Sequence, residues 1–200
     1  MGCQKSERTN SKLDKAKSAN YVFISVMGPH ANESEDEIFD RKANDIKKAG
    51  ESFWVSKINQ SFVDECRSKL NGQIGYLILV ESSGNGKAAA NTKTDERAKQ
   101  YSEDRINWKD IDNRMSPVTG KLGNGTTAYY FDALELCDGQ MDLDYYSESD
   151  NELKAIKFGL GHSNVFAKKK DIVMQGGMKS SKRKIVAVLR LKYPYIVWVK

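Results

Sequence analysis

The stretch Tyr21-Val22-Phe23-Ile24-Ser25-Val26-Met27 decides the fold, because it is the first long apolar run in the chain. Its length and its β-branched and aromatic content predict a buried strand, which Gly28-Pro29 ends. A similar run at residues 75–80 predicts a second buried strand, and the aromatic segment at 52–57 predicts another strand between them. The first half of the chain is therefore organised around three strands.

A helix is predicted between the first two of these strands. Asn32 or Ser34 can serve as its N-cap, acidic residues follow in the first turn, and Gly50 ends it after two lysines. Its predicted apolar stripe consists of Ile38, Phe39, Ala43 and Ile46.

A shorter helix is predicted between the second and third strands. Asn59 or Ser61 can cap it, and Asn71-Gly72 ends it. Strands that alternate with helices at this spacing predict βαβ units and a sheet that is at least partly parallel.

The second half of the chain is richer in strands. Residues 82–124 are polar and rich in Gly, Ser, Asn and Lys, which predicts a long polar flap. Strand patterns follow at residues 126–136, 155–158, 164–167, 185–191 and 195–199. We therefore expect an α+β (mixed α/β) fold, with a βαβαβ-like N-terminal half and a strand-rich C-terminal half, in one mixed sheet or a partly closed barrel.

The chain divides into two parts by composition. Residues 1–19 are polar and lack aromatic side chains, so we expect a disordered basic leader there. Residues 20–200 are expected to form a single globular domain, which is long enough to bury a substantial core.

The composition is that of a soluble protein in a reducing compartment. Hydrophobic residues make up 39% of the chain and charged residues 30%, an ordinary balance for a soluble domain. The apolar runs are all shorter than the ~18 residues that a membrane span needs. Three cysteines, Cys3, Cys66 and Cys137, are odd in number and widely spaced, and indicate neither a disulfide framework nor a metal site. We expect a cytoplasmic protein without a metal or cofactor.

The first six residues have the form of an N-myristoylation signal. Gly2 would be the acceptor, Cys3 could carry palmitate and Ser6 is the favoured hydroxyl, while the basic residues that follow would attract an anionic surface. The alternative is a plain basic leader. We expect no membrane association unless Gly2 is acylated.

Charge is segregated along the chain. Residues 168–200 carry ten Lys or Arg and one acid, a net charge of +9, and residues 1–19 carry a net charge of +3. Because the whole chain has a net charge of +5, residues 20–167 sum to −7. An acidic body with basic ends favours electrostatic steering toward a polyanion.

Basic and aromatic residues interleave in the C-terminal third of the chain. Nucleic-acid binding uses this combination, because cations neutralise phosphates while aromatic rings stack on bases. The rings could instead alternate into a core, with lysines discouraging edge pairing at the strand ends. The candidates for stacking are Trp54, Tyr195 and Trp198. The candidates for phosphate binding are Lys168, Lys169, Lys170, Lys182, Arg183 and Lys184.

The two histidines lie in separate turns. His30 follows the first strand and precedes the first helix, where open α/β sheets bind ligands, although the acidic first turn of that helix would repel an anion. The other turn leads into the basic residues and could hold a phosphate. The alternative, which the sequence favours at both positions, is a plain surface loop or hairpin. The second turn contributes Gly159, Gly161, His162 and Ser163 as candidates.

No catalytic or cofactor motif is complete. Residues 84–87, Gly-Asn-Gly-Lys, have the form of a phosphate-binding loop, but Glu81 stands in place of the first glycine and Ala88 in place of the hydroxyl. The acidic run at 138–152 lacks the spacing and the glycine of a calcium loop.

The order of elements at residues 53–57, 75–80 and 128–136 resembles that of PUA-like barrels, some of which read modified nucleobases. The resemblance covers about half of the chain and leaves out residues 21–49. It implies a barrel and a nucleobase ligand.

Three classes of function follow from these patterns. The first is a non-enzymatic binding protein for nucleic acid or a nucleotide-like anionic ligand, which uses the basic C-terminal region. The second is a small enzyme that acts on a nucleotide-like substrate, with His30 or His162 as acid or base and the flap as a lid. The third is a protein–protein adaptor or inhibitor that uses the acidic face at 138–152.

Overall fold

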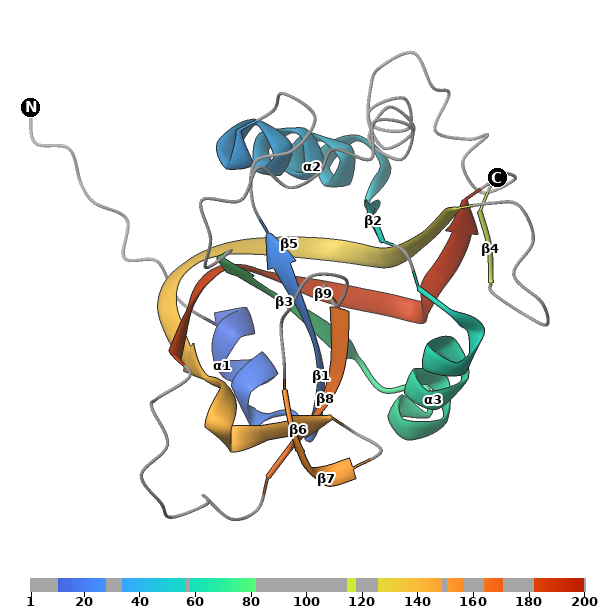
Figure 1. Cartoon of the computed structure of the whole chain (residues 1–200). Helices are drawn as coiled ribbons and strands as arrows, with labels where there is room; N and C mark the ends of the chain where they lie inside the picture. The colour runs from blue at the N-terminus through green and yellow to red at the C-terminus, as the bar shows by residue number, and fades with distance from the viewer. Residues whose placement is uncertain are drawn as a thin grey trace, which may run out of the picture.

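The computed structural model describes residues 11–27, 34–56, 58–81, 115–117, 126–148, 151–156, 164–170 and 182–199. The fold is α+β, with the described strands in one mixed sheet and helices on both of its faces (Figure 1). The helices are α1 (Ser11–Ser18), α2 (Glu35–Ala49) and α3 (Gln60–Leu70), with a short 3-10 helix, η1 (Leu143–Tyr145). The strands are β1 (Tyr21–Met27), β2 (Ser52–Val55), β3 (Gly75–Glu81), β4 (Met115–Pro117), β5 (Thr126–Asp142), β6 (Tyr146–Glu148), β7 (Asn151–Ala155), β8 (Asn164–Lys169) and β9 (Lys182–Val199).

The strand order is β2-β5-β9-β3-β1-β8-β6-β7, and β4 pairs with β9 beside this path. β1 and β3 are parallel, with Phe23 opposite Leu77, so the prediction of a partly parallel sheet is confirmed. The other described pairings are antiparallel, including that of β2 with β5 at one edge of the sheet. The barrel alternative is wrong: β2 and β7 end the strand order at opposite edges and do not pair with each other among the described strands.

Strands β1 and β3, in the middle of the sheet, are buried on both faces, as their continuous apolar sequence predicts. Phe23 and Leu77 belong to the core beneath α2 and α3, which we call the α2/α3 face. Ile24 and Ile78 belong to the core beneath α1, which we call the α1 face. This alternation follows from the two-residue period of a strand. Full burial of one such side chain contributes roughly 1.5–3 kcal/mol to stability.

The long strands β5 and β9 run past both cores and bend at irregularities in their pairing. One shift in register lies between Leu136 and Gly139, and Figure 1 shows β5 curving past α1 in this part of the sheet. At the other end Leu191 pairs with Phe131 and Ile196 with Tyr129, so residues 192–195 bulge opposite one residue of β5. The segments predicted at 185–191 and 195–199 are therefore one bulged strand.

Helix α2 begins and ends as its sequence predicts. The Ser34 hydroxyl accepts a hydrogen bond from the Glu37 N–H, the Glu37 carboxylate accepts one from the Ser34 N–H, and Gly50 ends the helix with φ of 80°. Helix α3 is capped by Asn59 and ends at Asn71, also as predicted.

The predicted apolar stripe of α2 is wrong at Ala43, which is exposed. Lys42 and Asp45 take the inward positions instead, at 3% and 1% exposure. The Ser52 hydroxyl donates to Asp45 Oδ2 at 2.7 Å, and Lys42 Nζ lies 3.8 Å from the same oxygen and 4.8 Å from the centre of the Phe53 ring. β2 thus supplies polar and aromatic partners that allow a charged pair to be buried.

The prediction of a disordered leader was wrong for residues 11–18, which form α1. Leu13 and Ala16, three positions apart, bury one side of this polar helix in the core of the α1 face. Residues 1–10, with the candidate acylation site at Gly2 and Cys3, lie outside the described residues. In the described part of the chain, no helix is long and apolar enough to cross a membrane.

Replacing Ser34 with alanine should lower the free energy of unfolding by about 1 kcal/mol, because the Ser34 hydroxyl can no longer accept from the Glu37 N–H or donate to the Glu37 carboxylate. Urea denaturation followed by circular dichroism measures the change. Ser68→Ala, at an exposed position inside α3, is the matched control and should leave stability nearly unchanged. Equal stabilities of the two variants would show that this cap does not stabilise the fold.

Candidate functional site

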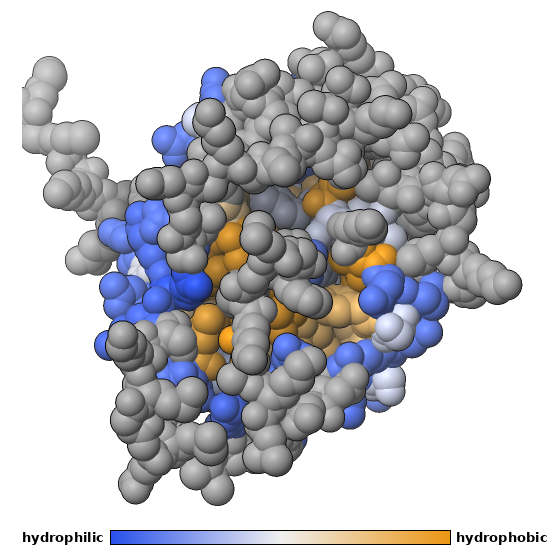
Figure 2. Space-filling model, in the orientation of Figure 1, coloured by the Kyte–Doolittle hydropathy of each residue, from blue (hydrophilic) through white to orange (hydrophobic). Residues whose placement is uncertain are grey.

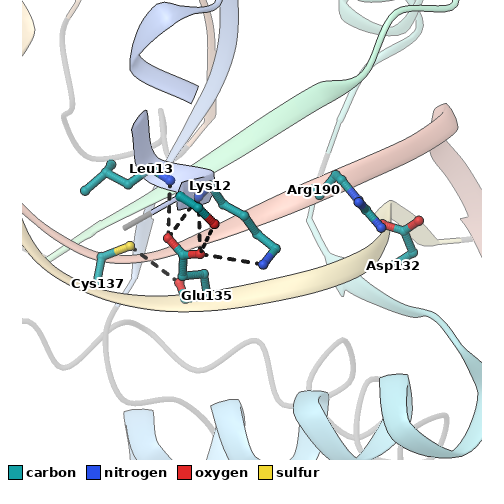
Figure 3. Close-up of polar contacts among 7 residues, drawn as sticks. Lys12, Leu13, Asp132, Glu135, Cys137 and Arg190 are labelled. Atoms are coloured by element: carbon teal, nitrogen blue, oxygen red, sulfur yellow. Dashed lines mark hydrogen bonds and ion pairs between the residues drawn. The ribbon is translucent and has the colours of Figure 1, made fainter. Parts of the chain in front are cut away.

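Helix α1 is held at its N-terminus by a carboxylate from the sheet. Glu135 of β5 accepts hydrogen bonds from the N–H groups of Lys12 and Leu13, at 3.1 Å and 3.3 Å, and Lys12 Nζ lies 3.6 Å from the same carboxylate (Figure 3). First-turn N–H groups have no partner inside a helix, and the helix dipole favours a negative charge at this end. Glu135 therefore supplies both the hydrogen-bond acceptors and the negative charge that stabilise the start of α1.

The C-terminus of α1 is held by a cation from another strand. Lys169 of β8 donates from Nζ to the carbonyl oxygen of Lys17 at 2.9 Å, where the helix dipole favours a positive charge. Each end of α1 thus contacts a side chain of the sheet whose charge is opposite to the helix dipole at that end. An eight-residue helix is marginal on its own, so these contacts and the burial of Leu13 and Ala16 are what stabilise it.

The fold brings the two C-terminal basic segments to the same part of the molecule. Lys182 pairs with Asp142 at the end of β5, and Lys169 pairs with Tyr146 at the start of β6. Only η1 separates Asp142 from Tyr146, and a 3-10 turn advances ~2 Å per residue. In addition, the Lys170 N–H donates to the carbonyl of Tyr145 at 2.8 Å.

The docking of α1 adds the basic residues of the N-terminal segment to this group. We call the resulting surface the basic corner. Figure 2 shows hydrophilic residues along the side where β5 curves past α1, with hydrophobic residues gathered further in. The basic corner consists of Lys15, Lys17, Lys168, Lys169, Lys170, Lys182 and Arg183.

Acidic residues lie among these cations. Asp142, which caps η1 by accepting a hydrogen bond from the Asp144 N–H at 3.0 Å, pairs with Lys182, so this part of the predicted acidic face at 138–152 lies within the basic corner. Four acids lie on α1 or on elements next to those that carry the cations: Asp14 on α1, Asp142 on β5, Asp144 in η1 and Glu148 on β6. The charges that the sequence separates are therefore partly mixed in space, with cations in excess.

Lys184, the remaining basic candidate, forms an ion pair with Glu81 at the end of β3. Its Nζ lies 3.6 Å from the Glu81 carboxylate. Glu35, in the first turn of α2, is close by: burial raises the pKa of its carboxyl group, and the charge of Glu81 raises it further, while Lys184 lowers it. Lys184 thus belongs to a local charge cluster rather than to the basic corner.

The predicted histidine turns are anchored at neighbouring strand ends. β1 ends at Met27, β8 begins at Asn164, and Ser25 of β1 pairs with Asn164. The candidate residues in these turns, His30, Gly159, Gly161, His162 and Ser163, lie outside the described residues. So does the predicted flap, apart from β4 at Met115–Pro117. Their roles stay predictions.

A polar network that the sequence did not indicate lies beside these anchors. The Tyr129 hydroxyl donates to Asn164 Oδ1 at 3.5 Å, and Asn164 Nδ2 donates to Ser56 Oγ at 2.6 Å. Burial raises the pKa of the Tyr129 hydroxyl well above its ordinary value, so the group stays protonated. The network links β2 to β8 across the α2/α3 face and is a structural tie.

The aromatic candidates differ in their accessibility. Trp54 is half-buried and stacks on Phe39, with ring centres 6.3 Å apart. The backbone of Trp198 pairs within β9 opposite Thr127. Tyr195 as a stacking platform was wrong: its ring is fully buried and its hydroxyl donates to the Gln73 carbonyl at 2.5 Å.

The bulge of β9 exposes Tyr193 instead, whose side chain is 63% accessible to solvent. It lies edge-on to Tyr195 with ring centres 5.6 Å apart, and Tyr195 adopts φ of 68° to turn inward. Alternation along a regular strand would place both rings on one face and cannot reveal this difference.

The described thiols are poorly suited to catalysis. Burial raises the pKa of the Cys66 thiol to about 12, and the reactive form of cysteine is the thiolate. Cys137 is buried in the core of the opposite face. Among the residues that the structure describes, no group of three His, Cys, Asp or Glu side chains is placed to hold a metal ion.

The fold and the site define a class: an α+β protein with a mixed sheet and a basic corner built around a docked N-terminal helix. No protein-family model matches this chain, and comparisons with curated proteins and with solved structures give no significant match.

The raised pKa of Cys66 predicts a stability that falls at high pH. The folded thiol stays protonated to about pH 12 while the unfolded thiol ionises from about pH 9, so unfolding is favoured as pH rises between these values. From about pH 9 to about pH 10.5 this linkage costs roughly 2 kcal/mol. Urea denaturation across this range should give a shallower pH dependence for Cys66→Ala than for the wild type. Cys137→Ala is the control, and a C66A slope identical to the wild-type slope would contradict the assignment.

Proposed function

We propose that this protein is a non-enzymatic binding protein for a polyanion, nucleic acid before nucleotide, and that the basic corner contacts the phosphates. The observation that carries the proposal is the docking of α1, since it sets Lys15 and Lys17 beside the C-terminal cations. Lysines and arginines that neutralise phosphates supply most of the sequence-independent affinity for nucleic acid.

The spacing of the cations favours a polymer over a single nucleotide. They come from three elements, α1, β8 and β9, and acids such as Asp142 and Asp144 stand between them. A compact phosphate ligand would meet these carboxylates as well as the lysines, whereas an extended chain can contact the projecting cations one after another. This arrangement predicts modest, strongly salt-dependent binding.

The protonation state of two buried side chains supports a binding protein rather than an enzyme. Cys66 and Tyr129 are both held in their protonated forms by burial. Cys66 and Cys137 lie on opposite faces of the sheet, which suits two thiols in a reducing compartment such as the cytoplasm. Base stacking by Trp54 or Trp198 and phosphate contacts from the histidine turns remain part of the hypothesis.

Removing two cations of the basic corner should weaken the salt dependence of binding. The variant Lys170→Gln/Lys182→Gln should bind a labelled single-stranded oligonucleotide of about 20 nucleotides with a log K against log salt slope that is smaller by about 1.4, because each lost phosphate contact contributes ~0.7. Fluorescence anisotropy at about 25 to 200 mM salt measures the slope.

The matched control is Lys47→Gln/Lys69→Gln, which removes the same charge from exposed positions at the ends of α2 and α3. Its slope should equal that of the wild type. Equal slopes for the two double variants would show that the basic corner is not the contact surface. A wild-type protein that binds no polyanion at the lowest salt would contradict the proposed function itself.

A further inference from the structure

We propose that α1 is a displaceable element whose docking assembles the basic corner, with Glu135 as the residue that positions it. The inference rests on the proposed function and concerns the regulation of the same surface. Its physical basis is that α1 is only eight residues long, that Leu13 and Ala16 are its buried apolar side chains, and that its two ends are held by polar groups of β5 and β8.

Formation and docking of α1 are a single event. Only Leu13 and Ala16 bury apolar side chains, and Leu13 packs over Gly139 of β5, where an added Cβ would lie 3.4 Å from Leu13 Cδ2. Polar contacts with the sheet come from Glu135 at one end and Lys169 at the other. Because so short a helix does not persist alone, losing these contacts unfolds it and releases its lysines from the corner.

Lys169 connects docking with ligand binding. A lysine ammonium group has three donors, and one of them is fixed by the Lys17 carbonyl at 2.9 Å. The other two remain able to donate to a phosphate, so docked α1 orients Lys169 while it contributes Lys15 and Lys17. Docking and polyanion binding should therefore favour each other, and reciprocity requires that the polyanion stabilise docked α1.

Cys137 is a natural reporter of this docking. It is 7% exposed and lies in the same buried cluster as Leu13 and Ala16, two positions along β5 from Glu135 (Figure 3). Displacement of α1 uncovers this thiol to a maleimide reagent. Cys66 lies beneath α3 on the opposite face, so it reports global unfolding instead.

The test compares two carboxylates on the same strand in a Cys3→Ser background. Glu135→Gln removes the charge at α1, whereas Asp132→Asn removes a charge paired with Arg190 Nε at 2.7 Å, away from α1 (Figure 3). Loss of a charged acceptor at a helix start should speed Cys137 labelling about tenfold in E135Q and leave it unchanged in D132N. Glu135→Asp, which keeps the carboxylate, should give an intermediate rate.

Whether E135Q binds the polyanion more weakly or more strongly than the wild type distinguishes a positioning role of Glu135 from a purely electrostatic effect of its charge. Removing an acid beside a basic surface should strengthen polyanion binding by charge alone, as D132N should do slightly. The proposal predicts the opposite for E135Q: binding of the 20-nucleotide probe weakened about three- to tenfold. A saturating concentration of the probe should also slow the labelling of Cys137 in the wild type.

Four results would overturn the inference. Equal Cys137 labelling in E135Q and D132N would remove the positioning role, and faster labelling in E135Q with unchanged or stronger binding would remove the coupling. Absence of binding by the wild type would reject the proposed function and the coupling together, while the labelling comparison would still decide whether Glu135 docks α1.

If Cys66 also labels in E135Q, the sheet has unfolded. Leu13→Gln, which acts from the helix side, must then expose Cys137 and weaken binding, or the inference fails.

Discussion

The contact between the Glu135 carboxylate and the first turn of α1 is the interaction on which the arrangement of the basic corner depends. It satisfies first-turn N–H groups that have no acceptor inside the helix, and it places a negative charge at the positive end of the helix dipole. Lys169 completes the pair at the other end. Together with the burial of Leu13 and Ala16, these contacts fix the position of the N-terminal lysines relative to the C-terminal ones.

The mixed sheet makes these contacts possible. β5 and β9 are long enough to extend past the central strands, and their irregular register lets them curve past α1. The parallel pair β1 and β3 is buried on both faces and separates two cores, so the contacts of α1 lie on one face of the sheet and those of α2 and α3 on the other. The proposed displacement of α1 would therefore leave the core of the α2/α3 face covered.

The elements predicted correctly from the sequence are those with local signals. The apolar runs of β1 and β3 and the caps at Ser34 and Asn59 require no knowledge of distant residues. By contrast, α1 looked disordered because its stabilising partners lie on β5 and β8 and its own sequence has only two inward apolar residues. The burial of Tyr195 followed from a bulge in β9, and the mixing of acids with lysines followed from the η1 turn, which linear charge counts cannot anticipate.

The most direct test of this account is native-state hydrogen exchange at the amides of Lys12 and Leu13. First-turn amides of an isolated or uncapped helix have no intrahelical acceptor, so their protection reports Glu135 itself rather than helicity in general. Both amides should exchange more slowly than in an unstructured chain. Exchange of these two amides at the unstructured rate, with or without protection later in α1, would contradict the central role of Glu135.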